Sequence, residues 1–258
     1  MRLLDINDGE NIKLTEFFGS TIPPYAILSH TWGPADEEVS LRDILENTGK
    51  NKAGFSKIEF CRRRATSDDL QYFWIDTCCI DKSSSAELTE AINSMFHWYQ
   101  RAARCYVFLS DVSENDLEKA DSHYKTALRQ SRWFSRGWTL QELIAPVTVD
   151  FFSQEGARLG DKKTLEKEIT EVTGIDSLAL QGHPLHNFRI ADRMSWAAKR
   201  TTTREEDNAY CLLGIFDVHM PLIYGEGKKA FIRLKEEVKK SSNGKLIAFP
   251  FATIDFGF

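Results

Sequence analysis

The chain has 258 residues, of which 42% are hydrophobic and 28% charged, so it can form one large domain or two small ones. This composition excludes a disordered or collagen-like chain. The formal net charge of -5 argues against nucleic acid as the main partner. The longest apolar stretch, Tyr210 to Phe216, is far shorter than the roughly 18 residues of a membrane span. Asp5 and Asp8 interrupt the place where a signal peptide would be apolar. We therefore expect a cytoplasmic protein with no membrane partner.

The basic run and the cysteines each allow two interpretations. The run Arg62-Arg63-Arg64 falls inside an amphipathic pattern, so a solvated helix face is favoured over a nucleic-acid contact. Five cysteines are an odd number without a disulfide framework, as expected of reduced thiols in the cytosol. The adjacent Cys78 and Cys79 would point to opposite faces of a strand. Buried thiols are therefore favoured over a zinc site.

Apolar runs and helical periodicities alternate along the first 150 or so residues, which predicts an α/β fold. The predicted strands cover residues 25–30, 72–80, 105–109 and 147–152. The predicted helices cover residues 54–66, 84–102 and 138–145, and a polar connection covers 113–130. Ser84 and Glu87 have the spacing of a capping box, and Pro146 closes the third helix. This order predicts βαβ units, a parallel sheet and right-handed crossovers.

The last hundred residues have helical patterns without apolar strand runs. The predicted helices here cover residues 164–173, 194–199, 206–216 and 228–240. We expect a helical extension of about 156–240 that packs on a core of about 20–155 without a linker. The tail, 241–258, is apolar, but Pro250 limits it to an edge strand or an irregular segment.

Polar residues follow the first three predicted strands. They are Ser29, His30, Thr31, Trp32, Asp76, Thr77, Asp81, Ser110 and Asp111. Because ligands of open parallel sheets bind beyond the carboxyl ends of the strands, these side chains are expected to ring one edge of the sheet. Each has a structural alternative: a turn role for Asp81 and Asp111, a satisfied structural role for His30, and packing for Trp32.

The most unusual segment is 131–143, which places three aromatic residues, two arginines and one carboxylate at a loop-to-helix junction. The carboxylate is Glu142, four residues after Trp138 and on the same helix face. A carboxylate directed into the edge of the sheet is costly unless it is used, and the alternative is an exposed glutamate. The sequence contains no Walker A, G-x-G-x-x-G, H-E-x-x-H or G-x-S-x-G motif.

Four long motifs carry a resemblance to a known family. They are AILSHTWG at 26–33, FWIDTCCIDKSSSAELTEAINSMFHWY at 73–99, RGWTLQELIAP at 136–146 and EEDNAYCLLGIFDVHMPLIYGEG at 205–227. Together they resemble the fungal heterokaryon-incompatibility (HET) domain over residues 1–240. The relatives that the resemblance indicates continue into a nucleotide-binding and WD-repeat receptor. The implied partners are therefore a NOD-like receptor or an incompatibility partner protein.

HET domains are in turn similar to TIR domains. The resemblance implies a TIR-like (flavodoxin-like) parallel sheet flanked by helices, with a C-terminal helical extension. The TIR pattern S-x-W-C-x-x-E-L is partly matched by Ser131, Trp133 and the segment 138–143, in which Thr139 replaces the cysteine. Glu142 stands where TIR enzymes have the glutamate that cleaves NAD between nicotinamide and ribose. The implied function is a cell-death effector and NAD glycohydrolase, with NAD as substrate and no cofactor or metal.

With NAD as the substrate, the predicted binding residues follow from the strand ends and from the chemistry of the side chains. Ser29, His30 and Trp32 would face NAD, and Arg136 would pair with its pyrophosphate. Asp76, Asp81 and Trp138 complete the predicted set. An active homo-oligomer is expected as well. The alternative function is a non-enzymatic death-signalling module that acts by homotypic association or partner recruitment. A metal hydrolase using His30, Asp76 and Asp81 is disfavoured, because their spacing matches no tetrahedral site.

Overall fold

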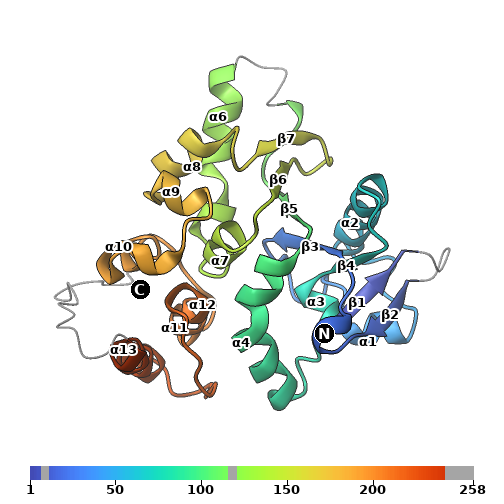
Figure 1. Cartoon of the computed structure of the whole chain (residues 1–258). Coiled ribbons are helices and arrows are strands. Elements are labelled where there is room, and N and C mark those ends of the chain that lie inside the picture. Colours follow the sequence, from blue (N-terminus) through green and yellow to red (C-terminus); the bar gives the residue numbers. More distant parts are fainter. Residues whose placement is uncertain (7–11, 116–120, 242–258) are drawn as a thin grey trace.

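The computed structural model describes residues 1–6, 12–115 and 121–241, and it is a mixed α/β fold built on a seven-stranded sheet (Figure 1). The strands are β1 (Arg2–Asp5), β2 (Lys13–Glu16), β3 (Tyr25–His30), β4 (Tyr72–Trp74), β5 (Arg104–Phe108), β6 (Val149–Phe152) and β7 (Arg158–Asp161). Their order across the sheet is β2-β1-β4-β3-β5-β6-β7. The sheet is thus mostly the one that the sequence predicts, extended at both edges.

The four central strands, β4, β3, β5 and β6, are parallel to one another, as predicted. All six residues of β3 are buried, which suits a central strand with both faces covered. The chain passes from β3 to β4 on one side and then crosses to β5 on the other side. The carboxyl ends of these strands therefore meet at one edge, around the end of β3. The antiparallel edge strands β1, β2 and β7 were not predicted.

The helices of the described residues are α1 (Leu41–Leu45), α2 (Phe55–Ser67), α3 (Asp76–Cys79), α4 (Ser85–Arg101), α6 (Asp121–Gln130), α7 (Thr139–Ile144), α8 (Glu166–Thr173), α9 (Ser177–Leu180), α10 (Ile190–Ser195), α11 (Asp207–Tyr210), α12 (Leu213–Phe216) and α13 (Lys229–Ser241), with 3-10 turns η1 (Gly19–Thr21), η2 (Arg132–Ser135) and η3 (Leu185–Asn187). None of the helices in these ranges is long and apolar enough to cross a membrane.

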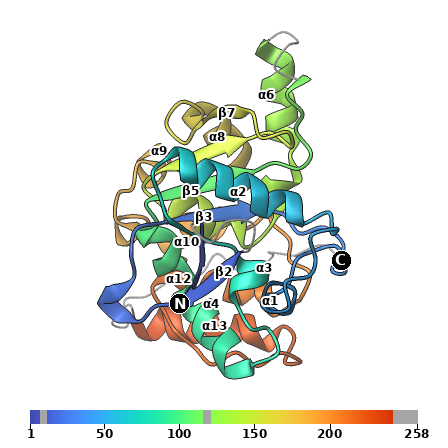
Figure 2. The ribbon, with the colours of Figure 1, turned by 90° about the vertical axis from the view of Figure 1, so that its right-hand side faces the viewer.

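Helices α2 and α4 lie on opposite sides of the central strands (Figures 1 and 2). From α2, Phe60 packs with its ring 5.0 Å from Phe108 and 5.1 Å from Phe152. On α4, Trp98 lies edge-on to Trp74, with ring centres 5.7 Å apart. The predicted capping box of α4 is half formed. Ser84 accepts from the backbone of Glu87, but the Glu87 carboxylate pairs with Arg2.

Two predicted segments differ from the structure. The strand predicted over 72–80 ends at Trp74, and Asp76–Cys79 forms the short helix α3. The argument that Cys78 and Cys79 face opposite sides of a strand is therefore wrong. All five cysteines are nevertheless free and buried, and the described residues contain no His, Cys, Asp or Glu cluster suited to a metal ion. The connection predicted over 113–130 contains α6, because Tyr124 and Leu128 bury an apolar side of it.

The C-terminal helices pack directly on the α/β core. Helix α12 lies against α4, and Gly214 brings its backbone so close that a Cβ atom there would lie 2.1 Å from Cβ of Phe96. The predicted helix over 206–216 is split into α11 and α12, and α10 begins four residues before the helix predicted over 194–199. The predicted tail lies outside the described residues apart from Ser241, the last residue of α13.

Candidate functional site

Glu142 lies on α7, a short helix that is buried along its whole length. Its side chain reaches the end of β3, where the Ser29 hydroxyl donates to Glu142 Oε2 at 2.5 Å. The Trp133 indole in turn donates to Ser29 Oγ at 2.9 Å. Glu142 is only 7% exposed, so the alternative of an exposed helix glutamate is wrong. The serine and the indole hold the carboxyl group in a fixed position.

Burial raises the pKa of Glu142 to about 8, and the negative charge of Asp76 acts in the same direction. Hydrogen bonds from Ser29 and Tyr99 and the positive charge of Arg200 oppose this shift without cancelling it. At neutral pH the carboxyl group is therefore mostly protonated. A small change in its surroundings is enough to ionise it, which is typical of acids and bases in active sites.

Arg200 is the nearby cation that the sequence analysis missed. It is 3% exposed, and its Nη1 donates to the Arg136 carbonyl at 2.9 Å and to Thr139 Oγ1 at 2.8 Å. Because Thr139 lies one helical turn before Glu142, the guanidinium is fixed to the same side of α7. Burial lowers the pKa of Arg200 to about 10, which leaves it charged at neutral pH. Its buried Nη2 has no hydrogen-bond partner within the part of the chain that the structure describes.

A second polar network surrounds Asp76, beyond the end of β4. His30 Nε2 lies 3.0 Å from Asp76 Oδ1, and the Trp32 indole donates to Oδ2 at 2.9 Å. Lys82 Nζ lies 3.8 Å from the centre of a Trp32 ring. Burial by itself disfavours the charge on Asp76, but the hydrogen bond from His30, the charges of Lys82 and His30 and the Trp32 bond outweigh it and lower the pKa to about 2. Among residues 1–6, 12–115 and 121–241, the buried His30 Nδ1 finds no hydrogen-bond partner.

The two networks flank the end of β3. Ser29 and His30 are adjacent in this strand, and adjacent strand residues direct their side chains to opposite faces. Ser29 therefore contacts Glu142 on one side of the sheet, and His30 contacts Asp76 on the other. The single ring of polar groups expected from the sequence is divided into two clusters, close enough for the charge of Asp76 to act on Glu142.

The remaining predicted residues lie away from Glu142 or have structural partners. Asp81 accepts from the backbone and hydroxyl of Ser83 at 2.9 and 2.5 Å, which is the turn role that the sequence left open. Asp111 likewise accepts from Ser131 and the Arg132 backbone. The partly exposed Arg136 side chain donates to Thr203. Trp138 bonds to Asp207 of α11, toward the C-terminal helices.

Three contributors to the Glu142 site were not predicted as such. Tyr99 falls within the helix predicted over 84–102, Trp133 falls within the aromatic segment 131–143, and nothing in the sequence marked Arg200. Tyr99 and Arg200 come from segments distant from Glu142 in the chain, whereas Trp133 lies nine residues before it. Cavities of about 890 Å³ and 570 Å³ occur in the described residues, and Glu142 lines neither of them.

Comparisons with known proteins agree with the motifs of the chain. Residues 25–130 match the sequence profile of the family described as "Heterokaryon incompatibility protein (HET)". The chain is also 56% identical, over 243 residues, to "Vegetative incompatibility protein HET-E-1" of Podospora anserina. The chain belongs to the heterokaryon incompatibility family. The match covers 93% of this HET chain but only 18% of the relative, so the chain spans about a fifth of that protein. No solved structure matches it.

The region matched by the family profile contains one of the two polar networks. It includes Ser29, His30, Trp32 and Asp76 but ends before Trp133, Glu142 and Arg200. The carboxyl group at the centre of the candidate site thus comes from a part of the HET chain that the profile does not reach.

Proposed function

We propose that this HET chain is a cell-death effector of vegetative incompatibility that acts in the cytoplasm and hydrolyses the nicotinamide–ribose bond of NAD. The name of the Podospora anserina relative supports the biological half of the proposal. The observation that carries the enzymatic half is the buried carboxyl group of Glu142, held by Ser29 at the carboxyl end of the central strand β3.

The strand order supports a TIR-like, flavodoxin-like core. If the parallel strands β3, β4, β5 and β6 are numbered one to four along the chain, their order in the sheet is 2-1-3-4. This is the order of the first four strands in flavodoxin-like folds, where ligands bind beyond the strand ends at the point where the order reverses. Ser29 and His30 end the strand that lies at this point.

The chemistry needs one correctly placed carboxylate. Cleavage of the nicotinamide–ribose bond develops positive charge on the ribose, as in glycoside hydrolysis. An ionised Glu142 would stabilise this charge, with Ser29 and Trp133 fixing the orientation of the carboxylate. Arg200 favours the ionised form, since its charge lowers the pKa of Glu142. Trp32 is 46% exposed and offers a ring face for stacking on the substrate.

A non-enzymatic association module is the second candidate, and one observation favours it. Glu142 is closed off from solvent and is mostly protonated at neutral pH. A carboxyl group in that state serves as a buried hydrogen-bonding residue without any reaction. In this case the surface of the domain, and not its interior, would carry the death signal.

An assay of NAD consumption by concentrated purified protein tests the proposal. We expect release of nicotinamide by the wild-type protein and its loss, by roughly 10²–10³-fold, in Glu142→Gln. Glu168→Gln is a matched control, because Glu168 is 6% exposed and pairs with Lys125 on α6, far from Ser29 along the chain. Cell killing should follow NAD cleavage in all three proteins. Killing by Glu142→Gln without NAD cleavage would instead support the association module.

A further inference from the structure

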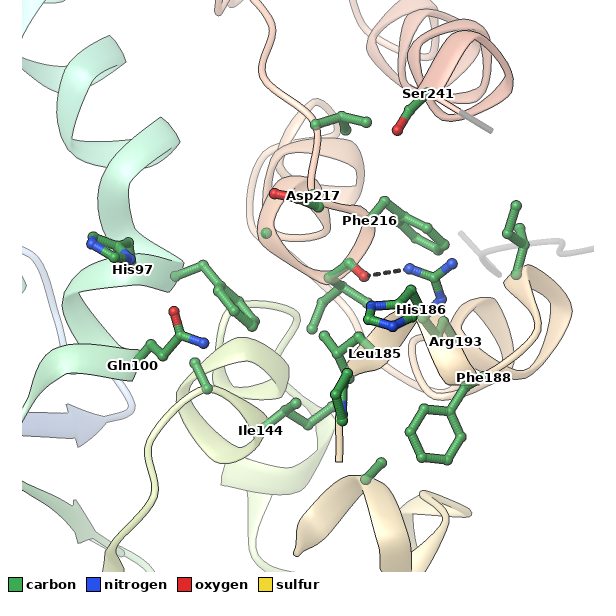
Figure 3. A pocket seen from close by; sticks show the side chains of 18 of the residues that line it. His97, Gln100, Ile144, Leu185, His186, Phe188, Arg193, Phe216, Asp217 and Ser241 are labelled. Carbon is green, nitrogen blue, oxygen red and sulfur yellow. Dashed lines mark hydrogen bonds between the residues drawn. The ribbon is translucent and has the colours of Figure 1, made fainter. Parts of the chain in front are cut away.

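A large cavity lies between the α/β core and the C-terminal helices. Its volume is about 890 Å³, within the range of small-molecule sites, and such sites favour the junctions between packed units. In Figure 3, His97 and Gln100 of α4 face it from one side, and Leu185, His186 and Phe188 face it from the other. Phe216 and Asp217 at the end of α12 complete its wall.

The lining of this cavity differs from the rest of the protein. Four of the six histidines of the chain line it: His97, His183, His186 and His219. Although 28% of the chain is charged, Arg193 and Asp217 are the only Asp, Glu, Lys or Arg among the described lining residues. An imidazole both donates and accepts hydrogen bonds, so the lining can bind polar groups at little cost in buried charge.

Arg193 is held in place within this wall. Its Nη1 donates to the Ile215 carbonyl at 2.8 Å, and its guanidinium lies 4.8 Å from the centre of the Phe216 ring (Figure 3). The Nε of Arg193 is buried and has no hydrogen-bond partner among the described residues. Since buried donors are nearly always satisfied, this N–H sets Arg193 apart from the arginines whose donors are all paired.

Apolar rings lie beside these polar groups. Phe96, Phe188 and Phe216 come from three different segments and line the same space. An anion alone would use the arginine and the imidazoles but make no contact with these rings. A planar ring that carries an anionic group would use both, since aromatic rings pack favourably edge-on or offset.

We propose that this cavity binds a small aromatic anion, a planar ring that carries a phosphate or carboxylate group. The anionic group contacts Arg193 and the nearby imidazoles, and the ring packs among Phe188 and Phe216. Ile144 and Ala145 also line the cavity, two and three residues after Glu142 along the chain. A bound ligand therefore touches the carboxyl-terminal end of the helix that carries Glu142. The binding itself does not depend on NAD hydrolysis.

Titration calorimetry with the full chain tests this proposal, with phenyl phosphate and adenosine monophosphate as ring-bearing probes and inorganic phosphate as the ring-free probe. We expect at least one ring-bearing probe to bind about tenfold more tightly than phosphate. Arg193→Gln should weaken that binding by about tenfold or more. Arg189→Ala is the matched control, because Arg189 is exposed, pairs with Asp192 and does not line the cavity.

A second variant guards against a folding defect in Arg193→Gln. His183 and His186 are exposed, so His183→Ala/His186→Ala should keep the melting temperature of the wild type while weakening the ring-bearing probe severalfold. The proposal is overturned if neither ring-bearing probe binds at millimolar concentration. It is overturned as well if phosphate binds as tightly as they do, or if Arg189→Ala weakens binding as much as Arg193→Gln.

Discussion

Glu142 is deeply buried, and the pKa of its carboxyl group lies close to neutral pH. Its pKa is about 8 in the folded chain and near 4.5 for an ordinary glutamate. Between these two values the folded state keeps a proton that the unfolded state has released. Folding is therefore favoured by this group at low pH, and its contribution is lost as pH rises toward 8.

Glu142→Gln should remove this pH dependence, because glutamine resembles the protonated glutamate in size and hydrogen bonding. We expect the stability of the variant, relative to wild type, to increase from pH 5 to pH 8 by at most about 1.4 kcal/mol per pH unit and then to level off. Chemical denaturation at a series of pH values measures it. A stability difference that is the same at every pH would show that Glu142 is ionised throughout this range.

Arg200→Met should have two effects. The acceptors on Thr139, Arg136 and Trp196 lose their donor, so the free energy of unfolding should fall by about 3 kcal/mol. The pKa of Glu142 should rise further, because the charge that favours its ionised form is gone. The difference in the free energy of unfolding between Arg200→Met and Arg200→Met/Glu142→Gln, followed across pH, measures this shift in the pKa of Glu142. An unchanged titration of Glu142 would show that Arg200 has only a structural role.

Trp32→Ala and Arg136→Ala test the outer part of the proposed NAD site. Trp32 is 46% exposed, and Arg136 makes one side-chain hydrogen bond, to Thr203, so both variants should fold. We expect each to raise the KM for NAD by about tenfold through loss of stacking or of a phosphate contact. Circular dichroism provides the check on folding. Unfolding of both variants would mark these residues as packing elements.

At the scale of single elements, the local hydrophobic pattern of the sequence predicted the central strand β3 and the flanking helices α2 and α4 well. The strand over 25–30 is confirmed residue for residue, and α2 and α4 lie within a few residues of their predicted ranges. These segments are long or strongly periodic, and each buries one continuous apolar face. Short elements with mixed faces were missed, among them β1, β2 and β7. Their strand state depends on pairing with neighbours that local sequence does not reveal.

The candidate site was predicted in part for the same reason. Ser29 and His30 follow from the rule for strand ends, and Glu142 follows from its isolation in an apolar helix. The division into two networks depends on the side of the sheet to which each side chain points. Because a strand was predicted over 72–80, the position of Asp76 at the start of α3 was not foreseen. Arg200 lies in a loop after α10, where no periodicity indicates its burial.

Gly214→Ala tests the contact between α12 and α4. The new Cβ would lie 2.1 Å from Cβ of Phe96, so one of the two helices has to move. We expect a loss of about 1–3 kcal/mol in the free energy of unfolding. In a Phe96→Gly background the obstructing Cβ and ring are both absent, and the same substitution should cost distinctly less. Equal costs in both backgrounds would show that the Phe96 side chain is not what opposes the new methyl group.

At the scale of the whole molecule, we expect the proposed function to depend on association. The resemblance to TIR enzymes implies an active homo-oligomer, so the specific NAD-cleaving activity of this HET chain should rise steeply with its concentration. An activity assay over a wide dilution series, with sedimentation in parallel, measures this. A constant specific activity across the series would show that the isolated chain is competent without a partner copy.

The five buried thiols can be used to measure which regions of the protein open first. Burial raises the thiol pKa of Cys105 on β5 and of Cys211, which follows α11, so neither reacts with alkylating reagents while its surroundings stay closed. The rate at which each becomes alkylated then reports the opening of its own region. Alkylation of Cys211 before Cys105 would mean that the C-terminal helices detach while the sheet persists. Equal rates would mean that the sheet and helices are lost together, as one cooperative unit.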